Sequence, residues 1–163
     1  MSWLAVLGLL LGLAGVPPIY PVGPPVPPPQ EGPVAVHYPP HLMDRVATRN
    51  QIPWQRVAVG GAVYYRIRGV LYAGLASTPL CPSATVGGSI QAEVYNRRTS
   101  RWEAGRFYQA DVSQAGDRDA QLTGQRLLEL DWDTMAALGA TVAQGWGRTP
   151  VRAVQPACPR RPS

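Results

Sequence analysis

Prolines are concentrated in one segment of this 163-residue chain, because residues 17–40 hold eleven of its eighteen prolines. Proline fixes its own backbone φ and lacks an N–H group, so a run of this density disfavours both helix and central strand. Such a run favours extended polyproline II conformations. The sequence therefore predicts a proline-rich, semi-rigid linker over residues 17–41 that precedes the folded part of the chain.

An apolar block comes before the prolines. Residues 3–16 contain no charged side chain, and fourteen such residues are short for a membrane-spanning helix but typical of the apolar part of a secretory signal peptide. We expect residues 1–16 to be a signal peptide or a short membrane anchor, and any membrane contact to run through them alone. The protein is then exported to the periplasm, the cell envelope or the medium.

Two cysteines occur, Cys81 and Cys158. In an exported protein an even number of cysteines can close a disulfide. Their isolated positions offer no cluster of metal ligands. His37 and His41 stand four residues apart, but the two prolines between them exclude the helix that would bring both imidazoles to one ion. We expect no metal and no cofactor.

The chain has a formal net charge of +5, and all fifteen of its basic residues are arginine. A positive charge favours anionic polymers such as nucleic acids, membrane surfaces and cell-wall polymers. The arginines are scattered in ones and twos, so nucleic-acid binding is not indicated. The exclusive use of arginine fits either selection for bidentate contacts with anions or a bias in codon usage.

Short alternating segments fill the remainder of the chain. We expect a helical lead-in over residues 42–61, a mainly β domain over residues 62–158 and a tail over residues 159–163. Within the domain, strands are predicted over residues 62–68, 70–77, 89–95, 102–112, 121–130 and 149–155, and a short helix over 132–138. Short strands at this spacing with little helix are typical of a small barrel or sandwich, and periodicity does not choose between the two.

Three segments in order carry a resemblance. "GLAS" stands at residues 74–77, a hairpin follows a Gly-Ser step within residues 87–112, and "LLELDWDTMAALGA" at residues 127–140 precedes "TPVRAV". This order resembles the rare lipoprotein A family over roughly residues 70–155. Members of that family carry a double-psi β-barrel, so the resemblance implies a small six-stranded double-psi β-barrel with one or two short helices.

Three carboxylates, Glu129, Asp131 and Asp133, mark the passage from the predicted strand into the predicted helix. Asp131 is expected to cap the helix by accepting hydrogen bonds from first-turn N–H groups. Asp133 is expected within that first turn, where a negative charge is favourable. Glu129 has no such structural explanation and occupies the position of the family's acid. The resemblance makes Glu129 the candidate catalytic acid and base, with Asp131 as the alternative.

The resemblance also implies a substrate. In the similar lytic transglycosylases, one carboxylic acid protonates the glycosidic oxygen of peptidoglycan and then acts as a base. The motif is incomplete here, since the family's histidine, expected near residues 81–84, is missing. The family's Asn-Asp-Arg-Gly turn aligns either with residues 113–116 or with Asp117 and Arg118. The incomplete motif favours binding of the glycan over its cleavage, and the alternative for Glu129 itself is a solvated or salt-bridged residue of the barrel without a role in either.

Aromatic side chains could stack on sugar rings beside such a site, and the candidates for substrate binding are Tyr95, Trp102 and Trp132, together with Asp117 and Arg118. The interpretation is an exported cell-envelope protein that binds peptidoglycan or a related glycan, with lytic transglycosylase-like activity if it is active. The alternative is a non-catalytic structural or assembly component of an envelope or a virion. In that case the barrel contacts other proteins and the carboxylates are only helix caps.

Overall fold

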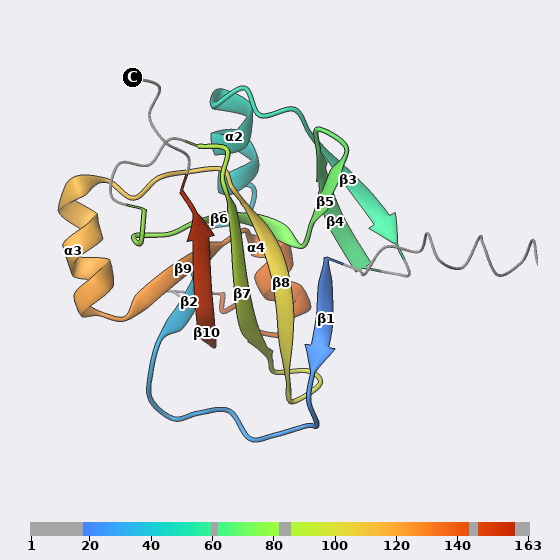
Figure 1. Ribbon diagram of the computed structural model, residues 1–163, viewed down its shortest axis with the longest axis vertical. Helices are drawn as coiled ribbons and strands as arrows, with labels where there is room; N and C mark the ends of the chain where they lie inside the picture. The colour runs from blue at the N-terminus through green and yellow to red at the C-terminus, as the bar shows by residue number, and fades with distance from the viewer. Residues whose placement is uncertain (1–17, 60–61, 82–85, 144–146, 159–163) are drawn as a thin grey trace, which may run out of the picture.

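A computed structural model of the chain describes residues 18–59, 62–81, 86–143 and 147–158. Six strands close a barrel, in the order β8, β6, β9, β2, β10 and β7, with β7 pairing back onto β8 (Figure 1). The mainly β fold with a small six-stranded barrel is confirmed. The barrel strands are β2 (Val34–His37), β6 (Gly74–Ser77), β7 (Ser89–Asn96), β8 (Arg101–Gln109), β9 (Arg126–Leu130) and β10 (Arg148–Ala157).

Two neighbouring pairs of barrel strands, β6 with β8 and β2 with β9, are parallel, and the other pairs are antiparallel. Parallel neighbours cannot be joined by a tight turn, so long connections cross the barrel. The described connections contain three helices, α2 (Leu42–Arg49), α3 (Ala115–Thr123) and α4 (Trp132–Ala137). The expectation of one or two helices missed α3.

The proline-rich segment is not a spacer, and the predicted linker over residues 17–41 is corrected. β1 (Ile19–Val22) pairs antiparallel with β8 at the edge of the sheet, and β2 is a barrel strand between β9 and β10. Proline is tolerated on an edge strand, where Pro21 lies, and the four residues of β2 contain none. The folded domain therefore begins well before residue 62.

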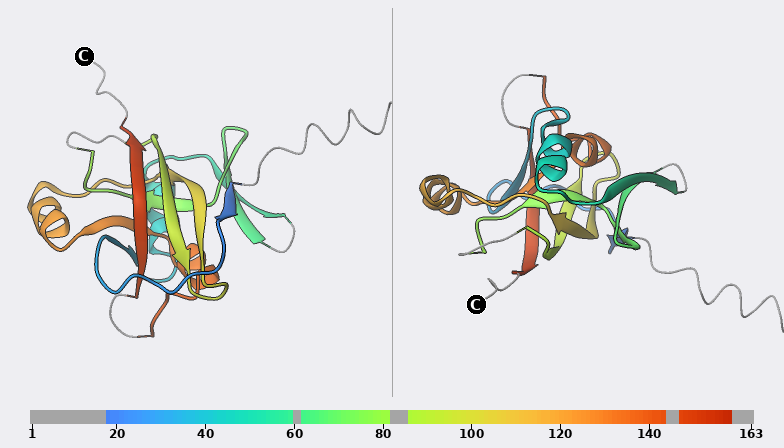
Figure 2. Two further views of the ribbon diagram at one scale, coloured as in Figure 1. Left: turned by 60° about the horizontal axis from the view of Figure 1, so that its bottom comes forward. Right: turned by 90° about the horizontal axis from the view of Figure 1, so that it is seen from above.

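The predicted helical lead-in contains α2, followed by a strand. That strand, β3 (Trp54–Val59), forms a separate antiparallel sheet with β4 (Ala62–Ile67) and β5 (Val70–Tyr72). Arg68 and Gly69 both have positive φ, as the two-residue turn between β4 and β5 requires. Figure 2 shows this small sheet extending to one side of the barrel.

Two hydrophobic clusters stabilise the fold. The first fills the barrel and includes Ile90, Phe107, Leu128 and Leu130, with Met135 of α4 packed against them. The second lies between α2 and the outer face of the barrel, and it includes Met43, Ala47, Tyr65, Leu75 and Tyr108. Because strand side chains alternate, Glu129 between two inward leucines points to the outer face.

A disulfide joins Cys81, which follows β6, to Cys158, which follows β10, across 77 positions of the chain. The expected pairing is confirmed. No helix in the described residues is both long and apolar enough to span a membrane. The expected signal peptide or anchor at residues 1–16 and the tail at residues 159–163 lie outside the described residues.

Candidate functional site

Glu129 lies on the outer face of β9, but it is enclosed there and only 9% exposed. Its Oε2 atom accepts hydrogen bonds from the hydroxyl groups of Ser77 (2.9 Å) and Tyr38 (3.0 Å). Ser77 stands opposite Glu129 on the neighbouring strand β6, and Tyr38 comes directly after β2. The sequence prediction of an isolated acid is therefore incomplete, because three elements supply a shared polar cluster.

Tyr38 connects Glu129 to a second carboxylate. Its hydroxyl oxygen lies 3.2 Å from Oδ2 of Asp111 and 3.3 Å from Oγ of Ser77. A phenol carries one proton, so Tyr38 can donate to only one of the two carboxylates at a time. Burial and the charge of Glu129 raise the pKa of Tyr38 far above its usual value, which keeps this hydroxyl protonated. Tyr38, Ser77, Asp111 and Glu129 are called the Glu129 cluster below.

Glu129 lies in the lining of neither of the two cavities described below. A general acid must reach the bond that it protonates. In this structure Glu129 instead bonds to neighbouring side chains on the outside of the barrel. Its geometry is that of a polar contact between strands.

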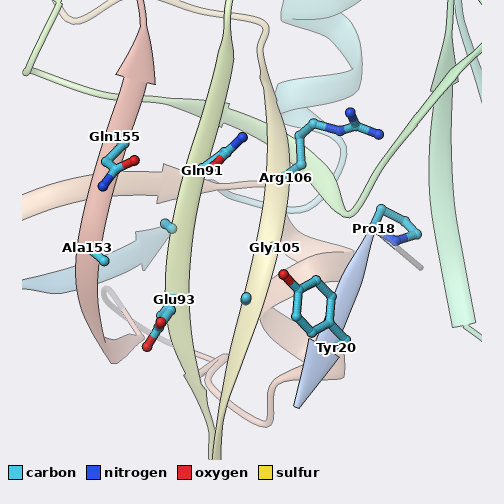
Figure 3. A pocket seen from close by; sticks show the side chains of 10 residues that line it. Pro18, Tyr20, Gln91, Glu93, Gly105, Arg106, Ala153 and Gln155 are labelled. Carbon is cyan, nitrogen blue, oxygen red and sulfur yellow. The ribbon is translucent and has the colours of Figure 1, made fainter. Parts of the chain in front are cut away.

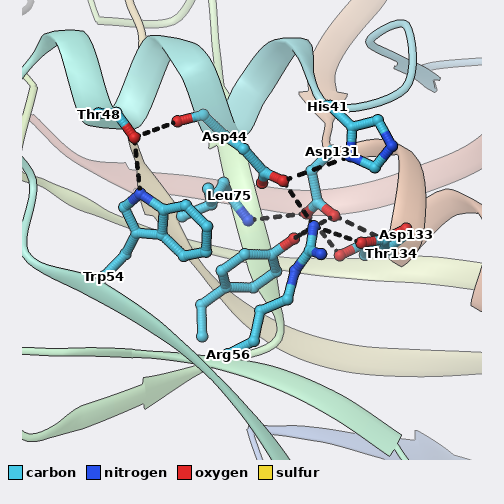
Figure 4. Close-up of polar contacts among 10 residues, drawn as sticks. His41, Asp44, Thr48, Trp54, Arg56, Leu75, Asp131, Asp133 and Thr134 are labelled. Carbon is cyan, nitrogen blue, oxygen red and sulfur yellow. Dashed lines mark hydrogen bonds and ion pairs between the residues drawn. The ribbon is translucent and has the colours of Figure 1, made fainter.

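Asp131 is the N-cap residue of α4, as expected, and it is 2% exposed. Its two oxygens accept from the N–H of Thr134 (3.0 Å), the hydroxyl of Thr134 (2.6 Å), the N–H of Leu75 (2.9 Å) and the hydroxyl of Tyr65 (2.9 Å) (Figure 4). Burial raises the pKa of Asp131 although these hydrogen bonds oppose the shift. With every oxygen occupied, Asp131 has a structural role.

Arg56 of β3 links the second sheet to two helices. Its guanidinium lies 2.7 Å from Asp44 of α2 and 2.6 Å from Asp133 in the first turn of α4 (Figure 4). The guanidinium also lies over the rings of Trp54 and Tyr65. Asp133 thus has the expected position in the helix and an ion pair that the sequence did not reveal.

The remaining residues predicted around the acid do not form one site. Trp132 is half-buried and its ring meets that of His37 edge-on, with centroids 4.7 Å apart. Asp117 is exposed on α3. Arg118 of the same helix donates to the carbonyl of Pro79 (2.8 Å), two residues beyond Ser77.

Tyr95 and Trp102 lie on a different outer face of the barrel, where β7 pairs with β8. Both are buried. The Tyr95 hydroxyl donates to the carbonyl of Val26 (2.6 Å), and the guanidinium of Arg152 covers the Trp102 ring at 4.2 Å from its centroid. These two rings are therefore under the surface and unavailable for stacking on a sugar.

The outer face next to these rings carries a shallow groove of about 420 Å³, called the outer groove (Figure 3). Two rows of side chains run across the strands there. One row consists of Gln155, Gln91 and Arg106 on β10, β7 and β8, and the other of Glu93, Ala104 and Tyr20 on β7, β8 and β1. Tyr20 is 43% exposed, so its ring is open to a ligand.

Small residues and an irregular strand give the outer groove its depth. Ala104, a small side chain on this face, lies between Glu93 and Tyr20, and Gly105 beside it lines the groove with its backbone alone. The register between β10 and β7 shifts between Arg152 and Gln155, and Ala153 in this bulge has a φ of 51°. Bulges of this kind bend a strand and are frequent next to binding sites.

Sequence reasoning missed the outer groove. In a strand over residues 89–95, alternation places Gln91 and Glu93 on one face, away from Ile90, Ala92 and Val94. This alternation identifies two of the residues that line the groove, Gln91 and Glu93. It could not show that β1 and β10 bring Tyr20 and Gln155 beside them.

Comparison of this chain with protein-family models, with curated proteins and with solved structures finds no match. Within the residues that the structure describes, no group of three or more His, Cys, Asp or Glu side chains could hold a metal ion.

The raised pKa values of Tyr38 and Tyr65 predict a loss of stability in alkali. Burial raises the pKa of both Tyr38 and Tyr65 far above 10 in the folded state, whereas unfolded tyrosines ionise near about pH 10. The unfolded state alone then releases these protons, so the free energy of unfolding should fall as the pH rises above about 10. Each such tyrosine contributes a slope of about 1.4 kcal/mol per pH unit.

Denaturant unfolding between about pH 10 and pH 11.5 measures this slope. We expect Tyr38→Phe to flatten it by about the contribution of one tyrosine relative to the wild type. Equal slopes for the two proteins would contradict a Tyr38 hydroxyl that stays protonated in the folded state.

Proposed function

We propose that this protein is an exported, non-catalytic glycan-binding protein of the cell envelope, whose ligand is peptidoglycan or a related polysaccharide. The ligand lies along the outer groove. The observation that carries the proposal is the pairing of one exposed aromatic ring with a row of polar side chains over a floor of small residues.

The chemistry of the outer groove suits a chain of sugars. Sugar hydroxyls both donate and accept hydrogen bonds, and the amides of Gln91 and Gln155 offer both functions. Arg106 and Glu93 add charge on paired strands, and each keeps a partner within the protein, since Arg106 donates to the carbonyl of Leu71 and Glu93 pairs with Arg152. Their remaining N–H groups and oxygen lone pairs can meet sugar hydroxyls. The exposed ring of Tyr20 offers an apolar face with a polar tip, which suits the C–H face of a sugar ring.

Two further observations support this proposal over glycan cleavage at Glu129 or an intracellular role. Glu129 is only 9% exposed, and its carboxylate already accepts hydrogen bonds from Ser77 and Tyr38. The disulfide between Cys81 and Cys158 supports export, because disulfides persist mainly in oxidising compartments.

Co-sedimentation with purified, insoluble peptidoglycan tests the proposal. The variant that combines Tyr20→Ala with Gln91→Ala should bind at least about tenfold more weakly than the wild type, because it loses a stacking surface and a bidentate amide. Gln114→Ala is the matched control, since Gln114 is an exposed glutamine at the start of α3, outside the groove lining. It should bind as the wild type does.

Two other results would overturn the proposal in different ways. Release of soluble sugars from peptidoglycan by the wild type but not by Glu129→Gln would make the protein a glycan-cleaving enzyme. Failure to sediment with peptidoglycan, combined with defined oligomers or a stable protein complex, would favour the structural or assembly role.

A further inference from the structure

A second cavity, of about 620 Å³, lies on the opposite side of β1 from the outer groove. It is bounded by β1, by the first half of β4 and by α4, and is called the edge cavity here. Its floor is apolar and built from small side chains, namely Ala62, Ala73, Ala136 and Ala137, with Leu138 beside them. Its volume falls in the range of pockets that bind small ligands.

Unpaired strand edges face the edge cavity. The N–H of Arg106 on β8 donates to the carbonyl of Pro18 (2.9 Å). By the alternation of an antiparallel ladder, the N–H and C=O of Ile19 and the C=O of Pro21, which has no N–H, then point away from β8, toward the side on which these residues line the cavity. An extended peptide could form hydrogen bonds with this edge, as in β-strand addition.

The other wall is also incompletely paired. β4 pairs with β5 only from Tyr65 to Ile67, so residues 62–64 have β3 as their one strand neighbour in the described sheet. The pairing of β5 with β4 ends at Tyr72. The next residue, Ala73, turns to the barrel instead, where its N–H donates to the carbonyl of Arg106 (2.7 Å). This divergence creates the space between β4 and β1.

The edge cavity is negatively charged in a positively charged protein. Arg56 at its margin already has two carboxylate partners, Asp44 and Asp133. Glu103, which also lines the cavity, accepts a hydrogen bond from the amide of Asn96 (2.7 Å), and no cation pairs with it among the described residues. A bound amine would meet a carboxylate that lacks a positive partner.

We infer that the edge cavity receives a short peptide substituent of the glycan, one that contains small residues and ends in, or branches to, a free amine. The inference rests on the proposed function, because the peptide arrives attached to the sugar chain in the outer groove. The unpaired edges supply main-chain hydrogen bonds, the alanine floor fits small side chains, and Glu103 pairs with the amine.

The two cavities are close enough for one branched ligand. Tyr20 lines both of them, and β1 is the edge strand that separates them. A peptide can therefore pass from the sugar around the edge of β1 without breaking any strand pair. Four extended residues reach roughly 13 Å, enough to cross one strand.

Binding of soluble glycan strands to the full-length protein tests the inference. Strands that retain amine-bearing peptides should bind at least about tenfold more tightly than the same strands after an amidase has removed the peptides. Glu103→Gln should lose this difference and bind both ligands as the wild type binds the peptide-free strands. Its amide oxygen can still accept from Asn96, which keeps the local structure.

Acetylation of the peptide amine provides a second measurement that does not depend on the folding of a variant. Acetylated strands should bind the wild type as weakly as peptide-free strands do, and acetylation should have no effect on Glu103→Gln. Equal binding of peptide-bearing and peptide-free strands would overturn this inference and leave the proposed function intact. Failure of every strand to bind would overturn the proposed function itself.

Discussion

Replacing Asp131 by alanine is expected to lower the free energy of unfolding by about 3–5 kcal/mol. The side chain accepts four hydrogen bonds in a buried position, and their donors come from α4, β6 and β4. Without the carboxylate, the N–H groups of Leu75 and Thr134 and the hydroxyl of Tyr65 would stay buried without a partner. For a domain of this size the midpoint of thermal unfolding should fall by roughly 10 °C.

The raised pKa of Asp131 clarifies where this loss originates. Burial disfavours the ionised carboxylate more than its hydrogen bonds favour it, so the charge as such is not a source of stability. The loss comes from donors that have no other acceptor. Asp131→Asn should therefore be milder, at about 2 kcal/mol, because its oxygen still accepts from Thr134 and Tyr65 while its NH₂ group meets the N–H of Leu75.

Asp133→Asn is the matched control, two positions along the same helix. Asp133 is 41% exposed and pairs with Arg56, which is 38% exposed. An exposed ion pair of this kind contributes less than about 1 kcal/mol. Chemical denaturation of the three variants and the wild type measures the free energy of unfolding of each. We expect the loss to be largest for Asp131→Ala, smaller for Asp131→Asn and smallest for Asp133→Asn. A loss at Asp133 equal to that at Asp131→Ala would contradict the structural role of the buried cap.

The prediction of Asp131 from the sequence succeeded because capping is local. The cap and the N–H that it accepts are three residues apart, and that spacing is visible in the chain. Glu129 was different, since its partners Ser77 and Tyr38 are 52 and 91 residues away. Strand alternation gave the direction of its side chain, but nothing in the sequence showed what covers that face.

The proline-rich segment illustrates a different failure. Its composition excluded regular structure on average, but strand formation depends on single positions. The four residues of β2 are free of proline, and Pro21 sits on an edge strand where a missing N–H is harmless. β2, which completes the barrel, and β1, which borders both cavities, therefore lie in the segment that its composition predicted to be a linker.

The aromatic residues show why residue type did not locate the binding surface. Trp102 and Tyr95 have the side chains most suited to stacking, but Arg152 and the backbone of Val26 cover them. Tyr20 lies in the proline-rich segment, and it is exposed because β1 is the last strand of the sheet. Exposure depends on strand order, which is a property of the whole chain.

Loss of the disulfide is the second large effect that we expect. In the chain-entropy model, a link across 77 positions stabilises the folded state by roughly 4 kcal/mol, because it restricts the unfolded chain. The bond also ties the end of β10 to the segment after β6. β10 pairs with β2 and β7, so its detachment would open the barrel and remove Gln155 from the outer groove.

The variant that combines Cys81→Ala with Cys158→Ala should therefore unfold at a clearly lower denaturant concentration than the oxidised wild type. Reduction of the wild type should reproduce that shift, whereas reductant should not affect the double variant, which controls for other actions of the reagent. Loss of the disulfide should also weaken glycan binding at denaturant concentrations near the unfolding transition, because the outer groove includes Gln155 of β10. An unchanged midpoint after complete reduction would mean that strand pairing alone holds β10, and that the disulfide does not stabilise the barrel.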